Sequence, residues 1–351
     1  MLYVARRAAV ITLVAGSIVL VALALWKLRL VVGLLFFAFI IAAAMRPGID
    51  WLAGHRLPRA AGLAVHYLAI VGVLAAAIAF AAPRALDQVN TALSPNGKAQ
   101  IARATRNSSG VKHQVLVALQ KRLNNLPKRS ALIKPATQAG IKAFKVMIGV
   151  LFTFAVAAYW IFERDRTIDV VCSLLPRPRR KVVRDTWDLI DAKLGAFVRG
   201  QLLLIILVGA ALSLLFWAVG EPYWLLIGAF AGVVEIVPVI GPLAAGALAV
   251  AVGFTASIHV AVLAAVCVLA VRLCEDYLVM PRVLGDAVGL SPLLVLVSVT
   301  VIGILFSGWA VLFAVPLAAV VVTVFDVVLR DVDPAEEEVP TVLFSAHESD
   351  G

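Results

Sequence analysis

The chain has 351 residues, of which 62% are hydrophobic and only 15% are charged. Soluble domains carry roughly 45 to 50% apolar and about 25% charged residues, so this composition excludes a soluble fold. A net charge of +10 would suit a nucleic-acid partner, but the cations stand in the connections between apolar segments. Membrane topology explains that placement better, and we expect no nucleic-acid partner.

Uncharged apolar segments begin near the N-terminus and recur along the chain. Each approaches the roughly 20 residues that a helix needs to cross a bilayer. We therefore predict an all-α integral membrane protein with about eight transmembrane helices. The shorter segments are Ala8–Trp26, Leu30–Met45, Gly62–Ala82, Val146–Phe162, Leu202–Gly220 and Ile258–Val271.

The connections divide the chain into four regions. Residues 1–82 are predicted to hold the first three helices, and 83–145 an extracytoplasmic insertion of amphipathic helices that is either a spacer or a cap. Residues 146–330 form a C-terminal transmembrane core with broken or re-entrant segments, and 331–351 an acidic disordered tail. Outside the insertion, most Lys and Arg fall on one side, which places both termini in the cytoplasm and Arg272 in an opposite, short connection.

Two apolar runs, Tyr223–Ile258 and Leu290–Phe325, have 36 residues each. A straight helix of that length would measure about 54 Å, against a hydrocarbon core of about 30 Å. The runs must therefore tilt strongly, break or fold back as re-entrant hairpins. Both contain residues that break helices: Pro238, Gly241 and Pro242 in the first, and Gly303 and Gly308 in the second.

Glu235 is the single charge in the first run and precedes Pro238 by three residues. A carboxylate near the bilayer centre costs at least about 2.5 kcal/mol on insertion scales and marks a functional site by default. Pairs of Gly- or Pro-interrupted apolar segments are the best sequence indicator of a transporter's binding site. We predict a protonation or cation site at Glu235, hinged at Pro238, Gly241 and Pro242. The alternative is a carboxylate bonded to backbone donors beside the prolines, in a kinked packing helix.

Polar residues flank these runs and form a second tier of candidate gate residues. Either they line the path of a solute or they are interfacial salt bridges. They are Arg199 and Gln201 before the fifth apolar segment, and Glu275, Asp276 and Pro281 before the second long run.

No pattern in the sequence indicates catalysis, a bound metal or a cofactor. The three cysteines form no CxxC pair, and the five histidines are scattered singly. No GxxxxGK[ST] loop for ATP is present. We therefore expect neither an enzyme nor a metal site. We expect no cofactor other than a coupling ion, H⁺ or Na⁺.

Ordered signatures occur between about residues 159 and 320. They are Phe197-Val198-Arg199-Gly200-Gln201, Val237-Pro238-Val239-Ile240-Gly241-Pro242, Glu275 to Gly285, Val288 to Leu293, and Gly308 followed by Ala314-Val315-Pro316-Leu317. These signatures resemble those of the AI-2E transporter family, also called the autoinducer-2 exporter or PerM-like permease family. Two departures are Val239, where the family usually has an aromatic residue, and Ser291, where it usually has histidine.

The resemblance implies about eight transmembrane helices and a large insertion after the third. It also implies an inner-membrane exporter or permease of small polar solutes, such as an autoinducer-2-like signal, or an antiporter of monovalent cations and protons, assembled as a homo-oligomer. The partners would be the lipid bilayer and that solute or cation. The alternative is a membrane scaffold or receptor that transports nothing, because fold does not settle substrate.

Overall fold

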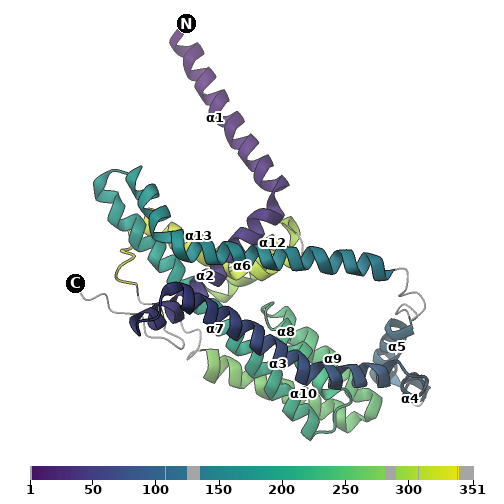
Figure 1. Ribbon diagram of the computed structural model, residues 1–351. Coiled ribbons are helices and arrows are strands. Elements are labelled where there is room, and N and C mark those ends of the chain that lie inside the picture. Colours follow the sequence, from purple (N-terminus) through teal and green to yellow (C-terminus); the bar gives the residue numbers. More distant parts are fainter. Residues whose placement is uncertain are drawn as a thin grey trace.

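The computed structural model describes residues 2–106, 108–124, 135–280, 290–306 and 308–337, together with Val339. These residues form helices and connections and contain no strand (Figure 1), which confirms the predicted all-α membrane fold. Pro281, one of the predicted gate residues, lies outside the described residues. Six of the described helices are long and apolar enough to cross a membrane: Arg29–Gly54, Arg59–Thr91, Phe144–Ser173, Arg177–Ala218, Ile258–Val279 and Ala310–Leu329.

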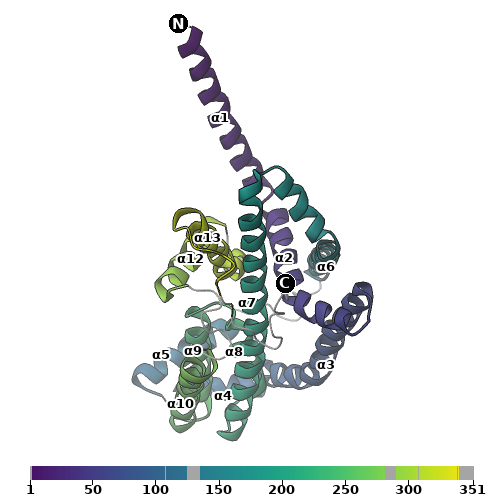
Figure 2. The ribbon, with the colours of Figure 1, turned by 90° about the vertical axis from the view of Figure 1, so that its left-hand side faces the viewer.

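The first helix projects away from the rest of the molecule. Helix α1 (Leu2–Lys27) is followed after one residue by α2 (Arg29–Gly54), and Figures 1 and 2 show α1 extending alone beyond the other helices. Its described side chains are exposed, and most of them are apolar. Such a helix is stable only where lipid or another chain covers it.

The described part of the predicted insertion is mainly helical, and its first residues continue the preceding span. Helix α3 (Arg59–Leu93) continues through Pro83 and is followed by α4 (Pro95–Arg106) and α5 (Gly110–Asn124). Both α4 and α5 pack against a later helix, α9 (Ile240–Ala256). The chain then returns through α6 (Pro135–Ser173).

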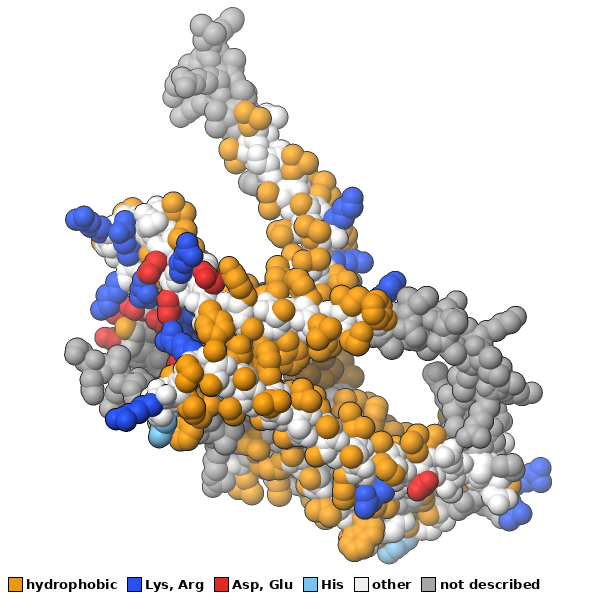
Figure 3. Space-filling model, in the orientation of Figure 1, with side chains coloured by type: hydrophobic (Ala, Val, Ile, Leu, Met, Phe, Trp, Pro, Cys, Tyr) orange, Lys and Arg blue, Asp and Glu red, His pale blue; other side chains and the backbone are white. Residues whose placement is uncertain are grey.

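The longest helix, α7 (Arg177–Ala218), joins two groups of helices. Its N-terminal half packs on α2, where Leu194 meets Ile40, and its C-terminal half supplies Val208 and Leu212 to a separate core. Figure 2 shows α7 running the length of the molecule between these groups. Charged side chains gather where α6 turns into α7, while orange apolar side chains cover most of the remaining visible surface, as expected of a surface that faces lipid (Figure 3).

The first long apolar run folds back as a hairpin. It forms α8 (Trp224–Val234) and α9, which are followed by α10 (Ile258–Cys274). A Cβ atom added to Gly253, near the end of α9, would lie 3.0 Å from Glu221, just before α8. At the opposite end Arg272 of α10 reaches Glu235 after α8. Helices α8 and α9 are therefore antiparallel, which decides between the tilted span and the hairpin.

This hairpin also changes the position predicted for Arg272. Counting of Lys and Arg placed it on the opposite side from Arg199. In the structure Arg272 contacts Glu235, whose backbone carbonyl accepts from Gln201, two residues after Arg199. Arg272 and Arg199 therefore lie toward the same end of the C-terminal half of α7, because the hairpin reverses the direction in which α10 runs.

The second long run also turns back on itself. Helix α12 (Pro292–Leu305) leads into the short 3₁₀ turn η3 (Gly308–Phe313) and then into α13 (Ala314–Leu329). Val299 and Ile302 of α12 pack on Ala310 and Ala314. Pro316 lies in the first turn of α13, where a missing N–H costs little.

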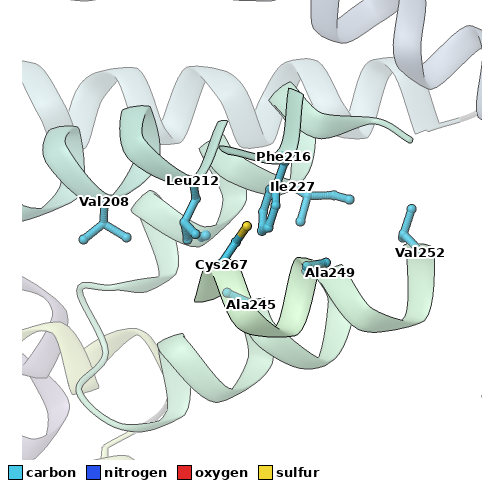
Figure 4. Packing of buried hydrophobic residues seen from close by; sticks show 10 residues of the cluster. Val208, Leu212, Phe216, Ile227, Ala245, Ala249, Val252 and Cys267 are labelled. Carbon is cyan, nitrogen blue, oxygen red and sulfur yellow. The ribbon is translucent and has the colours of Figure 1, made fainter. Parts of the chain in front are cut away.

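The core around α8 consists of small and branched apolar side chains (Figure 4). Glycines allow α7 and α8 to approach closely: a Cβ atom on Gly228 would lie 2.6 Å from the Cα of Ser213, and one on Gly232 would lie 2.8 Å from the Cα of Gly209. Small residues serve helix contacts in membranes in this way. The core residues are Val208, Leu212, Phe216, Ile227, Ala231, Ala245, Ala249, Val252, Ala264 and Cys267.

Candidate functional site

The connection between α8 and α9 contains a strained turn. Val239 has φ 67° and ψ −53°, a conformation that is uncommon for any residue with a Cβ and an outlier for a β-branched one. The Ile240 N–H donates to the Pro238 carbonyl at 2.7 Å, which closes a classic γ-turn, a rare and strained turn type. Strain of this kind costs roughly 1 to 3 kcal/mol and concentrates at functional sites.

Gly241 is required by the packing of this turn. A Cβ atom added to it would lie 2.0 Å from the carbonyl oxygen and 2.6 Å from the carbonyl carbon of Val234, which is far inside contact distance to backbone atoms that have little freedom to move. The Gly241 N–H also donates to the Val237 carbonyl at 2.9 Å. The break therefore brings the end of α8 and the start of α9 into direct backbone contact.

Three carboxylates surround the guanidinium of Arg272 at this break. Nη1 of Arg272 lies 3.2 Å from Oε1 of Glu235 and 3.3 Å from Oε2 of Glu275, and Nη2 lies 2.9 Å from Oδ1 of Asp276. The side chains of Glu235 and Glu275 are only 7% and 4% exposed, whereas Arg272 is 32% exposed. Two buried carboxylates from different helices thus share one donor atom.

A π-helical turn positions two of these carboxylates. Helix α10 passes directly into η2 (Glu275–Val279), which has the wider i→i+5 hydrogen bonding. Such turns are frequent at functional sites. It places Glu275 and Asp276 beside Arg272 on the preceding turn of α10.

Gln201 joins the same site from α7. Its buried side chain donates from Nε2 to the backbone carbonyl of Glu235 at 3.2 Å. That carbonyl lies where α8 ends, and carbonyls at the end of a helix have no partner within the helix. Gln201 therefore fixes the broken end of α8 against α7.

The charges of this cluster do not cancel when all of its groups are ionised. Three carboxylates face one guanidinium, so two negative charges are in excess. Negative charge held in apolar surroundings attracts a cation or a proton. Among the described residues, no group of three or more His, Cys, Asp or Glu side chains is arranged to hold a metal ion.

The structure brings together seven of the predicted site residues, and the other ones that it describes lie elsewhere. Glu235, Gln201, Glu275 and Asp276 converge at the break, with Pro238, Gly241 and Pro242 forming the turn. Arg199 instead donates from Nη1 to the Ala44 carbonyl of α2 at 3.2 Å. Gly303 lies inside α12, where a Cβ atom would be 3.2 Å from Val311, and Gly308 begins η3.

Three polar features did not emerge from the sequence. Arg164 of α6 is 5% exposed and forms ion pairs with Asp188 and Asp191 of α7, the latter at 2.5 Å. Buried Lys193 pairs at 2.6 Å with Glu337 in the acidic tail. Glu221 is buried, and its carboxyl oxygens have no hydrogen-bond partner among the residues that the structure describes. The Arg164 pairs had a faint signal, because Asp188 and Asp191 are three residues apart and so share a helix face.

The sequence of this chain is similar to those of one protein family and of several individual proteins. The family described as AI-2E family transporter matches residues 15–330. YrrI of Bacillus subtilis (strain 168) is 24% identical over 82% of this chain and 83% of its own length, and YueF of the same strain is 27% identical over 86% and 83%. Both carry provisional names as transport proteins. PerM of Escherichia coli (strain K12), provisionally named a permease, is 27% identical over 45% of each chain.

Proposed function

We propose that this chain, which belongs to the AI-2E transporter family, is a secondary transporter whose coupling site is the Glu235 cluster at the break between α8 and α9. The relatives that it resembles are named as transport proteins or as a permease. The proposed cargo is a small hydrophilic solute, such as an autoinducer-2-like signal, or a monovalent cation. Protons or sodium ions drive its export.

The observation that carries the proposal is the excess of carboxylates at a broken hairpin. Irregular backbone at membrane depth is tolerated only where it is buried in protein or lines a cavity that holds water. Transporters use such breaks to present carbonyl groups and helix ends to ions. Here Glu235, Glu275 and Asp276 compete for the single Arg272, so the cluster is arranged to gain and release positive charge.

A coupling cycle follows from this competition. When a proton or sodium ion occupies Glu235, its attraction to Nη1 of Arg272 weakens, and Arg272 retains Glu275 and Asp276. When the ion leaves, Glu235 pairs with Arg272 again and draws α10 toward the break. The strained Val239 turn and the backbone contact at Gly241 form the hinge through which α9 moves relative to α8.

Location and assembly belong to the same proposal. We place the protein in the inner membrane with both termini in the cytoplasm, as a homo-oligomer that binds no nucleic acid and has no enzymatic activity. The exposed apolar face of α1 supports contacts with lipid or further subunits. No hydrolysis of ATP is required, because ion gradients supply the driving force.

The test is transport by purified protein in liposomes. Internal pH is recorded after sodium, potassium or proton gradients are imposed, with candidate signalling solutes added on one side. We expect flux in the wild type and its loss in Glu235→Gln, which keeps the size of the side chain and removes its charge. Glu163→Gln, at a partly exposed site paired with Arg166, is the matched control and should retain flux.

The other outcomes separate the alternatives. Equal flux in the wild type and Glu235→Gln would retain transport and reject Glu235 as the coupling site. Absence of flux under every gradient, together with normal folding, would favour the scaffold or receptor.

A further inference from the structure

Glu221 occupies the other end of α8 from Glu235. It lies in the connection between α7 and α8, outside the spans themselves, and only 2% of the residue is exposed. Neither Oε1 nor Oε2 has a hydrogen-bond partner among the described residues. A buried side chain that leaves both of its oxygens unsatisfied requires an explanation, because such groups are rare in folded proteins.

The surroundings of Glu221 form an apolar enclosure. The backbone N–H of Glu221 donates to the Phe216 carbonyl at 2.8 Å, just after the end of α7. Figure 4 shows Phe216, Ile227 and Val252 at this end of the core. Gly253 of α9 leaves room for the carboxyl group, since a Cβ atom there would lie 3.0 Å from Oε2 and 2.7 Å from the Cα of Ala261.

No cation among the described residues neutralises this carboxyl group. From α10, Cys267 interacts with it electrostatically, while His259 is exposed. Gln88 of α3 is uncharged, and its Oε1 accepts from the Leu226 N–H at 3.2 Å. Helices α3, α4 and α5 pack on α8 or α9 near this end. No described ion pair joins Glu221 to their charged or titratable side chains or to Tyr223 just before α8. The described groups include Arg84 and Asp87 of α3, Arg103 and Arg106 of α4, and Lys112, His113 and Lys121 of α5.

An ionised carboxylate in such an enclosure would be costly. Burial of an isolated charge without a partner costs several kcal/mol even after relaxation, and a carboxyl group avoids this by retaining its proton. Burial accordingly raises the pKa of Glu221 to about 8. The neutral acid fits the site, whereas the anion requires the site to open to water.

We propose that Glu221 is a proton-binding site: its carboxyl group carries a proton while α9 and α10 enclose it, and releases that proton to water when these helices move away from the end of α7. The reaction is the ionisation of a carboxylic acid, in which the O–H bond breaks, the electron pair stays on oxygen and water accepts the proton. This site is separate from the Glu235 cluster, because α8, 11 residues long and so roughly 16 Å, lies between them.

The proton itself is the probe in the test. Infrared spectroscopy of the full chain in nanodiscs follows the C=O band of protonated carboxyl groups from about pH 6 to about pH 10. We expect the wild type to lose one protonated carboxyl group near pH 8. Glu221→Gln should lack that loss, and Glu221→Asp, which remains ionisable, should retain one. A loss of the same size in Glu221→Gln would overturn the proposal.

Two further comparisons keep the site distinct from its alternatives. Glu235→Gln should keep the Glu221 titration, so failure of the transport proposal leaves this result unchanged. Thermal unfolding near pH 8 in sodium chloride is compared with that in choline chloride. We expect Glu221→Gln to leave unchanged any difference between the two midpoints, and a sodium-dependent rise in the wild type that Glu221→Gln abolishes would assign a cation site in place of the proton site.

Discussion

The two ends of α8 hold the same kind of side chain in opposite surroundings. Glu235 is 7% exposed and pairs with Arg272, and its backbone carbonyl accepts from Gln201. Glu221 is 2% exposed, and neither of its carboxyl oxygens has a hydrogen-bond partner within the part of the chain that the structure describes. The paired end keeps Arg272 beside its carboxylates when one of them gains or loses a cation, whereas the unpaired end is stable only as the neutral acid. Burial alone therefore does not define the role of a carboxylate in a membrane protein, because that role also depends on which groups pair with it.

Removal of the shared cation should have the largest effect on this comparison. Arg272→Ala leaves Glu235 and Glu275 buried without their donor, and breaking a buried ion pair in this way costs roughly 3 to 5 kcal/mol. We expect a large fall in the thermal unfolding midpoint of the purified protein. Arg330→Ala is the matched control, because its side chain is 69% exposed and its pair with Asp326 is worth at most about 0.5 kcal/mol.

A double variant makes the first prediction specific. Glu235→Gln combined with Arg272→Ala removes one of the stranded charges and should recover part of the lost stability. If the double variant is as unstable as Arg272→Ala alone, the pair does not contribute as described.

The unpaired end should show its character through pH. The native pKa of Glu221, about 8, lies above the ordinary value of 4.5, so the folded protein holds this proton more tightly than the unfolded chain. The stabilisation is complete below about pH 4.5 and is lost as pH rises through about 8. Glu221→Gln should therefore gain stability over the wild type progressively as pH rises from about 4.5 to about 8, reach an advantage of a few kcal/mol, and gain no more above that pH. Unfolding midpoints from about pH 4 to about pH 9 measure this, with Glu163→Gln as a variant that should follow the wild type.

The hinge beside Glu235 should tolerate little. Gly241→Ala forces a Cβ atom to within 2.0 Å of a backbone carbonyl, and overpacking of this kind costs roughly 1 to 3 kcal/mol. Gly72→Ala is the matched control, since a Cβ atom there meets nothing within 4 Å. Equal unfolding midpoints for the two variants would show that α8 and α9 do not approach as closely as described.

The smallest effect is expected where strain is removed. Val239→Gly permits the positive φ of the γ-turn at no steric cost and should stabilise the fold by about 1 kcal/mol. Val239→Ala keeps the Cβ atom and most of the strain. Chemical denaturation of both variants distinguishes them, and a Val239→Gly protein no more stable than Val239→Ala would contradict a strained hinge.

Sequence reasoning reached the fold class and one of these two ends. Uncharged segments of membrane length predicted the all-α membrane fold, and a carboxylate beside Pro238 singled out Glu235. Glu275 and Asp276 were only flanking candidates, because their convergence on Arg272 depends on the α8–α9 hairpin. Hydropathy could not distinguish that hairpin from a tilted span, since both bury the same apolar run.

Glu221 was missed for a related reason. It stands between Gly220 and Pro222 at the end of an apolar segment, where a carboxylate is ordinarily solvated at the membrane interface. Its burial comes from α9 and α10, which are distant from it in the chain, so no local pattern reveals it. Arg199 is the opposite case, because it was predicted for this site and lies elsewhere. It stands two residues before Gln201, but residues two apart on a helix do not face the same way, and Arg199 contacts α2.

The central claim, that ion coupling resides at the paired end of α8, is tested most directly by electrical recording from proteoliposomes on a solid-supported membrane. Rapid steps in proton or sodium concentration are applied to the wild type, Glu235→Gln and Glu163→Gln. We predict a transient current in the wild type and Glu163→Gln and none in Glu235→Gln. A current of equal size in Glu235→Gln would contradict the claim.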